Sequence, residues 1–377
     1  MKHIKTVRVF QLVIVSLFFL LSQVFAQSNE EIFEQQTTAV SPSGKLLAAY
    51  WGESISIFNI ESGAKLHQFD AGTEDPFVLK FSADSTKLLS SGWDAVSVWD
   101  MEKGKRIARK TSTENAECGV ISNDHSKIYY DDQYHDFGYK QLLVANGSLK
   151  KEKIIFKNNG DCNTSPDQTL LAIQSYKFDD DEYSVDEYQV NVINLATGNI
   201  QNTFVGEEAN AYDEDMFFFD NNRKLLVRDY SDFHVWDVEN DTLVKTVEID
   251  MDVDEVSVSG NLALLTDDLQ MSFWDLTNEP GQIKTIPLPE NHNELLSASL
   301  SNNGELYVVT SSVEGTNDLS VSIIDAKSNT VKHQMAVNYP GWAADFANND
   351  TIVVLQNYPI QVIDVATGNI VHEFEMD

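Results

Sequence analysis

The stretch that decides the fold is VLKFSADSTKLLSSGWDAVSVWDMEKGKRIARK, residues 78–110. It contains short runs in which apolar residues alternate with small or polar ones, a pattern typical of β-strands, and turn-forming residues separate these runs. We place them at 77–81, 87–91, 95–99 and 106–110. Four such strands predict one small antiparallel sheet. A sheet of this size cannot bury its own apolar faces, so it needs similar sheets beside it.

Units of the same kind recur through the rest of the chain. The turns that follow their first strands contain, in order, Ser41, Ser82, Ser122, Ser165, Asp220, Ser259, Ser301 and Ala347. Neighbouring turns are about 40 to 55 residues apart, which is close to the spacing of propeller blades. An apolar second strand follows each turn. A third strand then ends in a short motif such as Val98-Trp99-Asp100 or Val362-Ile363-Asp364.

These repeats resemble those of the WD-repeat β-propeller family, and the unit at 363–370 resembles the related bacterial YVTN-type repeats. The Trp-Asp signature of the family is carried by Trp99-Asp100, Trp236-Asp237 and Trp274-Asp275, and Asp94 matches its tight-turn Asp. The resemblance does not extend to the buried His-Asp network of the family, because no Gly-His dipeptide precedes a first strand. The third repeat, 117–157, is degenerate, with Val144 where the Asp would fall.

The resemblance covers residues 37–377 and implies an all-β fold, a β-propeller of four-stranded antiparallel blades. Eight repeats predict eight blades, with seven as the alternative because seven is commonest in the family. The last repeat already has its own fourth strand, which argues against the usual completion of the ring by an N-terminal strand. The segment at 27–36 is a candidate for a short closing strand instead.

The N-terminus has the pattern of a signal peptide. Lys2, Lys5 and Arg8 precede an apolar run at 9–21, and Val24-Phe25-Ala26 supplies a cleavage motif. We therefore expect removal of residues 1–26 and export to the periplasm or the medium of a bacterium, with an uncleaved anchor as the alternative. No later segment is long and apolar enough to span a bilayer.

The net charge of −33 argues against binding to nucleic acid or to an anionic membrane surface. In the resembled fold, the loops from second to third strands, and from fourth strands to the next blade, share one face, which we call the top face. The remaining turns form the bottom face. Acidic runs at 179–187, 207–215 and 250–255 fall in top loops, whereas most Lys and Arg fall in bottom turns. This segregation predicts a cationic partner at the top face, although adaptation to high salt would also make a surface acidic.

Large aromatic residues gather in the same top loops, and Tyr and Trp dominate the energetics of protein interfaces. Local packing at the blade ends is the alternative for any single ring. The predicted protein-binding residues are Trp51, Trp93, Tyr134, Asp179, Asp180, Asp181, Tyr183, Tyr212, Tyr230, Trp342 and Tyr358.

The sequence offers weak candidates for other chemistry. Asp250, Asp252 and Asp254 form a weak calcium candidate, because the central Gly and the distal Glu of a calcium loop are missing. Asp161 and Asp345 are isolated carboxylates near the ring axis. We place no histidine on an innermost strand and find no nucleotide-binding or nucleophile motif. We therefore predict no catalytic residues and no cofactor.

Cys118 and Cys162 are the only cysteines, and both precede the turn of an innermost strand in neighbouring repeats. An oxidising compartment would allow them to form a disulfide, worth roughly 4 kcal/mol on the chain-entropy model. Their offsets from the following Ser differ by one residue, which would turn the two side chains to opposite faces. The pairing therefore stays open.

We interpret the chain as a non-enzymatic exported scaffold that binds a protein or peptide with a basic surface through its top face. Binding of a glycan or small ligand, or an enzymatic use of the channel mouth, is the second hypothesis. A purely structural envelope protein is the third.

Overall fold

The computed structural model describes residues 37–71, 76–111, 116–133, 140–178, 185–206, 216–229, 232–249, 253–267, 269–277, 281–288, 292–313, 315–316, 319–337, 343–347, 350–356 and 359–375. The predicted signal peptide at 1–26 and the candidate closing strand at 27–36 lie outside this part of the chain. None of the described residues forms a helix long and apolar enough to cross a membrane.

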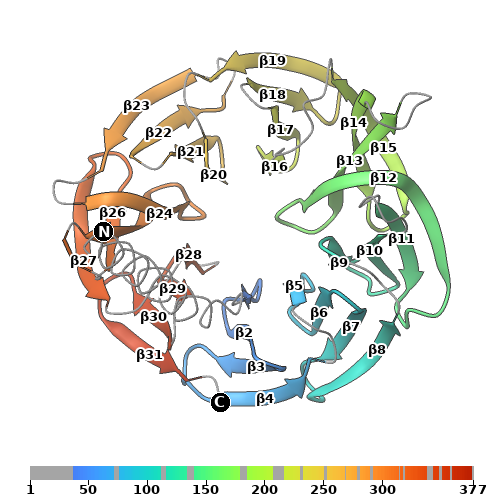
Figure 1. The fold of residues 1–377 in the computed structure, drawn as a ribbon, viewed down its shortest axis with the longest axis horizontal. Coiled ribbons are helices and arrows are strands. Elements are labelled where there is room, and N and C mark those ends of the chain that lie inside the picture. Colours follow the sequence, from blue (N-terminus) through green and yellow to red (C-terminus); the bar gives the residue numbers. More distant parts are fainter. Residues whose placement is uncertain are drawn as a thin grey trace, which may run out of the picture. The chain divides into compact units, whose positions relative to one another are not determined.

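The described residues form an all-β propeller of eight blades, each a four-stranded antiparallel sheet (Figure 1). Blades 1 and 2 consist of β1 (Thr38–Val40), β2 (Leu46–Trp51), β3 (Ser54–Asn59), β4 (Lys65–Asp70), β5 (Pro76–Phe81), β6 (Lys87–Gly92), β7 (Ala95–Asp100) and β8 (Lys105–Thr111). Blades 3 and 4 consist of β9 (Gly119–Ile121), β10 (Lys127–Gln133), β11 (Lys140–Asn146), β12 (Glu152–Thr164), β13 (Leu170–Phe178), β14 (Val185–Asn194) and β15 (Asn199–Gly206).

The second half of the chain repeats the same arrangement. Blades 5 and 6 consist of β16 (Met216–Phe219), β17 (Lys224–Asp229), β18 (Asp232–Asp237), β19 (Thr242–Glu248), β20 (Glu255–Ser259), β21 (Leu262–Thr266), β22 (Gln270–Asp275) and β23 (Gly281–Pro287). Blades 7 and 8 consist of β24 (His292–Leu300), β25 (Leu306–Val313), β26 (Leu319–Asp325), β27 (Thr330–Val337), β28 (Ala343–Phe346), β29 (Ile352–Gln356), β30 (Ile360–Asp364) and β31 (Ile370–Phe374). The fold class and the blade number agree with the first of the two sequence-based predictions.

Blades 3 and 4 depart from the regular pattern because they share one strand. The first part of β12, at 152–159, pairs with β11 as the outer strand of blade 3, and its last part, at 159–164, pairs with β13 as the inner strand of blade 4. The two blades therefore form one continuous seven-stranded sheet. A register shift between Asn159 and Cys162 marks the point where the strand passes from one blade to the next.

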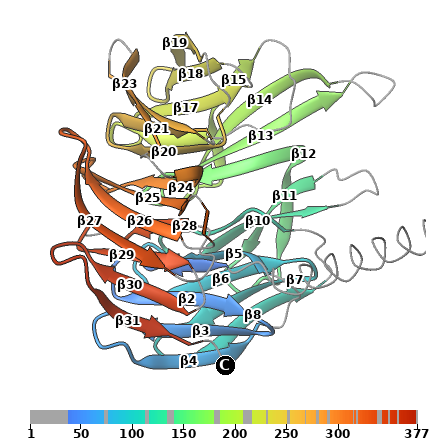
Figure 2. The same ribbon diagram turned by 60° about the vertical axis from the view of Figure 1, so that its left-hand side comes forward.

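Blades pack on one another through a repeated aromatic contact. The Trp of the Trp-Asp motif stacks on a Phe in the outer strand of the preceding blade, as in Trp99 on Phe69 and Trp236 on Phe204, with ring centroids 4.5 Å apart in both pairs. Phe58 of blade 1 packs in the same way on Phe374 of blade 8, at 4.4 Å. Blade 8 keeps four strands of its own, so among the described residues the ring closes by packing rather than by exchange of a strand (Figure 2).

The last residue of each third-strand motif, an Asp or an Asn, caps the turn that follows it. In blade 2, for example, Asp100 Oδ1 accepts a hydrogen bond from the backbone N–H of Lys103 at 3.0 Å. In blade 3 the equivalent acceptor is Asn146, which receives the N–H of Lys150 at 3.0 Å. The alignment that placed Val144 at this position is therefore wrong by two residues. The capping group survives in blade 3 as an amide.

The placement of the histidines also needs one correction. His292 lies on β24, the innermost strand of blade 7, and its Nδ1 lies 2.6 Å from Ser311 Oγ. The prediction that no histidine lies on an innermost strand is therefore wrong. It failed because β24 begins several residues earlier than the apolar pattern indicates, within a polar stretch.

Candidate binding site on the top face

A polar cavity of about 200 Å³ opens where blades 3 and 4 join. Its walls come from the connection between β8 and β9, from the end of β10 and from the middle of β12, which all belong to the top face. Met216, at the start of β16, adds an apolar side chain from blade 5. The lining residues are Glu117, Cys118, Asp131, Gly160, Asp161, Cys162, Asn163 and Met216.

A disulfide between Cys118 and Cys162 forms part of the wall, with their Cα atoms 6.0 Å apart. The structure therefore shows the disulfide that the sequence analysis left undecided. Cys118 lies just before β9 rather than within it, so strand alternation does not govern the direction of its side chain. The bond joins blade 3 to blade 4 in addition to their shared strand β12. A disulfide is typical of proteins that fold in an oxidising compartment.

Asp131 is the central carboxyl group of the cavity. It is fully buried, and its Oδ1 accepts a hydrogen bond from the backbone N–H of Cys118 at 2.8 Å. Its Oδ2 has no hydrogen-bond partner among the described residues, and Lys140 Nζ lies 3.9 Å away. Burial raises the pKa of Asp131 to about 7, because the Cys118 N–H and the charge of Lys140 offset only part of the desolvation. The cavity therefore contains a carboxyl group that titrates near neutral pH.

The charges around Asp131 are mostly negative. The ammonium group of Lys140 pairs with Glu117, which also lines the cavity. Asp161 adds a third carboxylate at the exposed side of the wall. The side-chain amide of Asn163 donates to the backbone carbonyl of Met216 at 2.7 Å, which ties blade 4 to blade 5. Three carboxyl groups thus face one lysine, and the arrangement favours a bound cation.

Trp93 is 50% exposed, and its turn is connected to the cavity through the backbone. It sits in the turn between β6 and β7, and the carbonyl of the preceding Gly92 accepts the backbone N–H of Ala116 at 3.2 Å. Ala116 is the residue before Glu117, so the Trp93 turn is attached directly to the cavity rim. Trp51 has a different role. It is partly buried and packs against the apolar cluster between blades 1 and 8, as the local-packing alternative expects.

The other predicted binding residues lie outside the described part of the chain, and their role stays a prediction. They are Tyr134, Asp179, Asp180, Asp181, Tyr183, Tyr212, Tyr230, Trp342 and Tyr358. The same holds for Asp250 and Asp252 of the calcium candidate. Asp254 is described, and no group of three or more His, Cys, Asp or Glu residues that could hold a metal ion occurs within the described residues.

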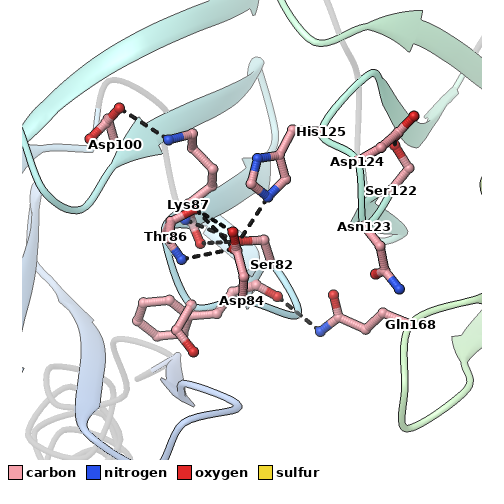
Figure 3. Close-up of polar contacts among 12 residues, drawn as sticks. Ser82, Asp84, Thr86, Lys87, Asp100, Ser122, Asn123, Asp124, His125 and Gln168 are labelled. Atoms are coloured by element: carbon pink, nitrogen blue, oxygen red, sulfur yellow. Dashed lines mark hydrogen bonds and ion pairs between the residues drawn. The ribbon is translucent and has the colours of Figure 1, made fainter.

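A second polar cluster lies in the bottom turns of blades 2 to 4 (Figure 3). In blade 2, Asp84 accepts the hydroxyl of Ser82 at 2.7 Å and the backbone N–H of Thr86 at 3.0 Å. Desolvation would raise the pKa of Asp84, but these hydrogen bonds outweigh it and lower the pKa to about 2. His125 of blade 3 reaches back to Asp84 at 3.2 Å, as Figure 3 shows.

The same turn recurs in the next two blades. Asp124 of blade 3 and Asp167 of blade 4 accept the corresponding hydroxyl and N–H groups, and the pKa of each carboxyl is lowered. Gln168 of blade 4 donates its amide to the carbonyl of Phe81 in blade 2 at 3.0 Å. These contacts join blades 2 to 4 at their inner edges. They are structural, because each carboxylate already has its partners within its own turn.

Lys80 is a further group that the sequence analysis did not single out. It lies on β5, and its Nζ donates to the hydroxyl of Thr164 on β12, so it reaches from blade 2 to blade 4. Burial lowers its pKa to about 8. The position of a lysine within the apolar run Val78–Phe81 is the sequence signal that could have identified it as a buried charged group.

No protein-family model matches the sequence, and no curated protein matches it. The fold resembles several solved structures at low sequence identity. The C-terminal WD40 domain of Sif2 is 12% identical, with a TM-score of 0.64, 87% of this chain covered and 95% of that chain. The dihydro-heme d1 dehydrogenase NirN is 13% identical, with a TM-score of 0.67 and 92% and 79% covered. A eukaryotic initiation factor is 16% identical, with a TM-score of 0.57 and 90% and 87% covered. At such identities these similarities show the propeller fold alone.

Proposed function

We propose that this propeller is a non-enzymatic interaction scaffold whose top face binds a protein or peptide with a basic surface. The observation that carries the proposal is the acidic cavity of blades 3 and 4 with the half-exposed Trp93 attached to its rim. Carboxylates attract Lys and Arg, and an exposed Trp offers cation–π contact and a large apolar area. Propellers of this fold often serve as interaction scaffolds.

The size of the cavity supports a side chain as its occupant. Sites for drug-sized molecules usually enclose about 300 to 1,000 Å³, whereas this cavity encloses about 200 Å³. One long side chain of a partner suits the smaller volume better than a glycan ring system does. The rest of a protein partner would then lie over the top face, where Trp93 is half-exposed.

The disulfide supports an extracytoplasmic location for this scaffold, because such bonds persist in oxidising compartments. Together with the signal-peptide pattern at 1–26, it favours the periplasm or the medium as the place of action. The partner would then be another protein of the cell envelope or one met outside the cell.

The test is capture of partners from the envelope fraction of the source organism by the protein from Gln27 onward, with Trp93→Ala as the variant. Ile283→Ala serves as the control, because Ile283 is equally exposed, at 56%, but lies on the outer strand β23. We expect a partner that is retained by wild type and by the control, is lost by Trp93→Ala, and is released as salt rises from about 0.01 to 0.15 M. A partner retained by all three proteins would contradict the proposal, as would the capture of none.

A further inference from the structure

The cavity of blades 3 and 4 has a feature that a generally acidic surface does not explain. Asp131 is a carboxyl group without solvent exposure, and one of its two oxygens has no hydrogen bond among the described residues. Buried polar groups in proteins are almost always hydrogen-bonded, because an unsatisfied group costs free energy. Asp131 lines the cavity, so a donor that enters the cavity can approach this oxygen once the neighbouring side chains shift.

We propose that this cavity is a binding site for a single ammonium or guanidinium group, with Asp131 as the buried counter-charge. The proposal deepens the proposed function, because it names the group of the partner that the top face takes, namely a lysine or arginine side chain or a chain N-terminus. It depends on the proposed function in one respect, namely that the cation belongs to a protein partner.

The surrounding groups favour a cation over a neutral donor. Lys140, from β11, is the one cation facing Asp131 from the described residues, and its ammonium group is drawn to Glu117. Glu117 precedes β9 and Asp161 lies on β12, so carboxylates approach the cavity from two further segments. An incoming cation would gain the attraction of three carboxylates against one lysine, and burial strengthens the interaction with Asp131.

The apolar parts of the wall suit the stem of a long basic side chain. Met216 and the disulfide of Cys118 and Cys162 line the cavity beside the carboxylates. Lysine and arginine place their methylene groups against such surfaces while the charged end reaches a partner. The site thus has a place for each part of such a side chain.

The ionisation of Asp131 would couple binding to pH. Its pKa of about 7 means that the group is largely protonated at pH 5.5 and ionised at pH 8. A cation binds the ionised form, so affinity should rise with pH across this range, and binding should lower the pKa of Asp131. Glu117 and Asp161 face the same cavity and would supply a background attraction at both pH values.

The test uses n-butylammonium chloride as the probe and n-butanol as its neutral control, with binding followed by saturation-transfer difference NMR on the protein from Gln27 onward. We expect saturable binding of the ammonium probe at pH 8, at least about tenfold weaker binding at pH 5.5, and no comparable binding of n-butanol. Asp131→Asn should lose at least about tenfold in affinity and lose the pH dependence.

Asp132→Asn is the matched control for Asp131→Asn. It removes the same charge from the neighbouring position of β10, where strand alternation turns the side chain to the opposite face, and it should bind the probe within about twofold of wild type. Equal losses in the two variants would overturn the proposal, because only the general negative field would then be acting. Equal binding of n-butanol and n-butylammonium would also overturn it.

A measurement without any variant covers the case in which Asp131→Asn does not fold. The amide N–H of Cys118 donates to Asp131 Oδ1, so its NMR chemical shift should follow the ionisation of Asp131. Saturating n-butylammonium should move the midpoint of that titration to lower pH, and an unchanged midpoint would refute the site.

The results of these binding experiments can be distinguished from the result of the partner-capture experiment. A Trp93-dependent partner without probe binding would leave the scaffold without this pocket, and probe binding without a partner would leave the pocket without the scaffold.

Discussion

The bottom turns of blades 2 to 4 and the top cavity of blades 3 and 4 use aspartate in opposite ways. Asp84, Asp124 and Asp167 each accept a hydroxyl and a backbone N–H from their own turn. The pKa of each of these carboxyls is lowered. Asp131 is fully buried, and its pKa is raised to about 7. An ionised aspartate therefore stabilises the turns at the bottom face, whereas burial destabilises the ionised form of Asp131 at the top face.

The difference follows from how regular each region is. The bottom turn is part of the repeat, so the sequence supplies a Ser, an Asp and a Ser or Thr at fixed positions in successive blades. The cavity forms where the repeat is interrupted, since blades 3 and 4 share β12 and blade 3 has an inner strand, β9, of only three residues. The satisfied turns join blades 2 to 4 at their inner edges, and the interruption leaves Asp131 Oδ2 without a hydrogen bond among the described residues.

The largest effect on stability should come from replacing Asp131 in the cavity and, separately, Asp124 in a bottom turn. The pKa of Asp131 is raised from 3.8 to about 7, so its protonated form stabilises the folded state below about pH 4, and this stabilisation is lost as pH rises through 7. A shift of about three units corresponds to up to about 4 kcal/mol. Asp131→Asn should therefore be more stable than wild type at pH 8, by up to that amount, and should lose the advantage near pH 4.

Asp124→Asn should behave in the opposite way. The pKa of Asp124 is lowered by the hydroxyl of Ser122 and the N–H of Ser126, so the stabilisation it supplies is present above about pH 4 and disappears in acid. The variant should therefore be less stable than wild type at pH 8 and equal to it at low pH. Chemical denaturation midpoints across pH 3 to 8 measure both profiles. Profiles of the same sign for the two variants would abolish the distinction between the two regions.

The disulfide provides the next largest effect. It closes a loop of 44 residues, and removing such a bond costs roughly 4 kcal/mol on the chain-entropy model. The double variant Cys118→Ser/Cys162→Ser should unfold at a correspondingly lower denaturant concentration. Because the bond forms part of the cavity wall, its removal should also weaken n-butylammonium binding. The amide chemical shifts of the bottom turns should stay unchanged. Shifts spread evenly over all blades would show that the two regions are not separable.

The sequence was sufficient to predict the regular region. A serine marks the first turn in five of the blades, and its hydroxyl oxygen accepts the backbone N–H five residues later. These serines are Ser41, Ser82, Ser122, Ser165 and Ser301. Local spacing was enough here because the hydrogen bonds are made within six residues. The blade number followed from counting these turns.

Local spacing could not predict the candidate site, because its groups come together only through contacts between blades. Asp131 is a polar residue after the apolar start of β10, and the sequence pattern does not show that this strand continues to Gln133 and carries it into the buried wall. Glu117 precedes β9 and Lys140 begins β11, so its surroundings come from separate segments of a repeat that is too degenerate to align, as the error at Val144 shows. The cysteines were visible in the sequence, but whether they pair depends on a strand shared by two blades.

Two glycines test whether the bottom turns also hold neighbouring blades together. Gly104, in the bottom turn between β7 and β8, has a φ of +57°, and an added Cβ would lie 2.4 Å from His67 Nδ1 of blade 1. Moving that ring would break the contact of its Nε2 with the carbonyl of Met101, which is 2.9 Å long. Gly52, in a top loop, has a φ of +58°, with nothing within 4 Å of an added Cβ.

We expect Gly104→Ala to cost about 2 kcal/mol, from backbone strain plus the lost contact, and Gly52→Ala about 1 kcal/mol, from strain alone. Thermal unfolding of the two variants measures the difference. Equal losses would mean that the His67 contact contributes nothing to the joining of blades 1 and 2. A larger loss at Gly52 would reverse the assignment of stability to the bottom face.

The smallest effect concerns the ion pair between blades 2 and 3. Nε2 of His125 lies 3.2 Å from Asp84, whose side chain is 49% exposed, so solvent screens the interaction. Exposed pairs contribute about 0.2 to 1 kcal/mol, and a double-mutant cycle with His125→Ala and Asp84→Asn should give a coupling energy in that range at pH 5.5. The coupling should shrink in high salt, because ions screen a pair that is exposed to solvent. A coupling energy that stays the same in high salt would contradict the assignment of this contact as an exposed ion pair.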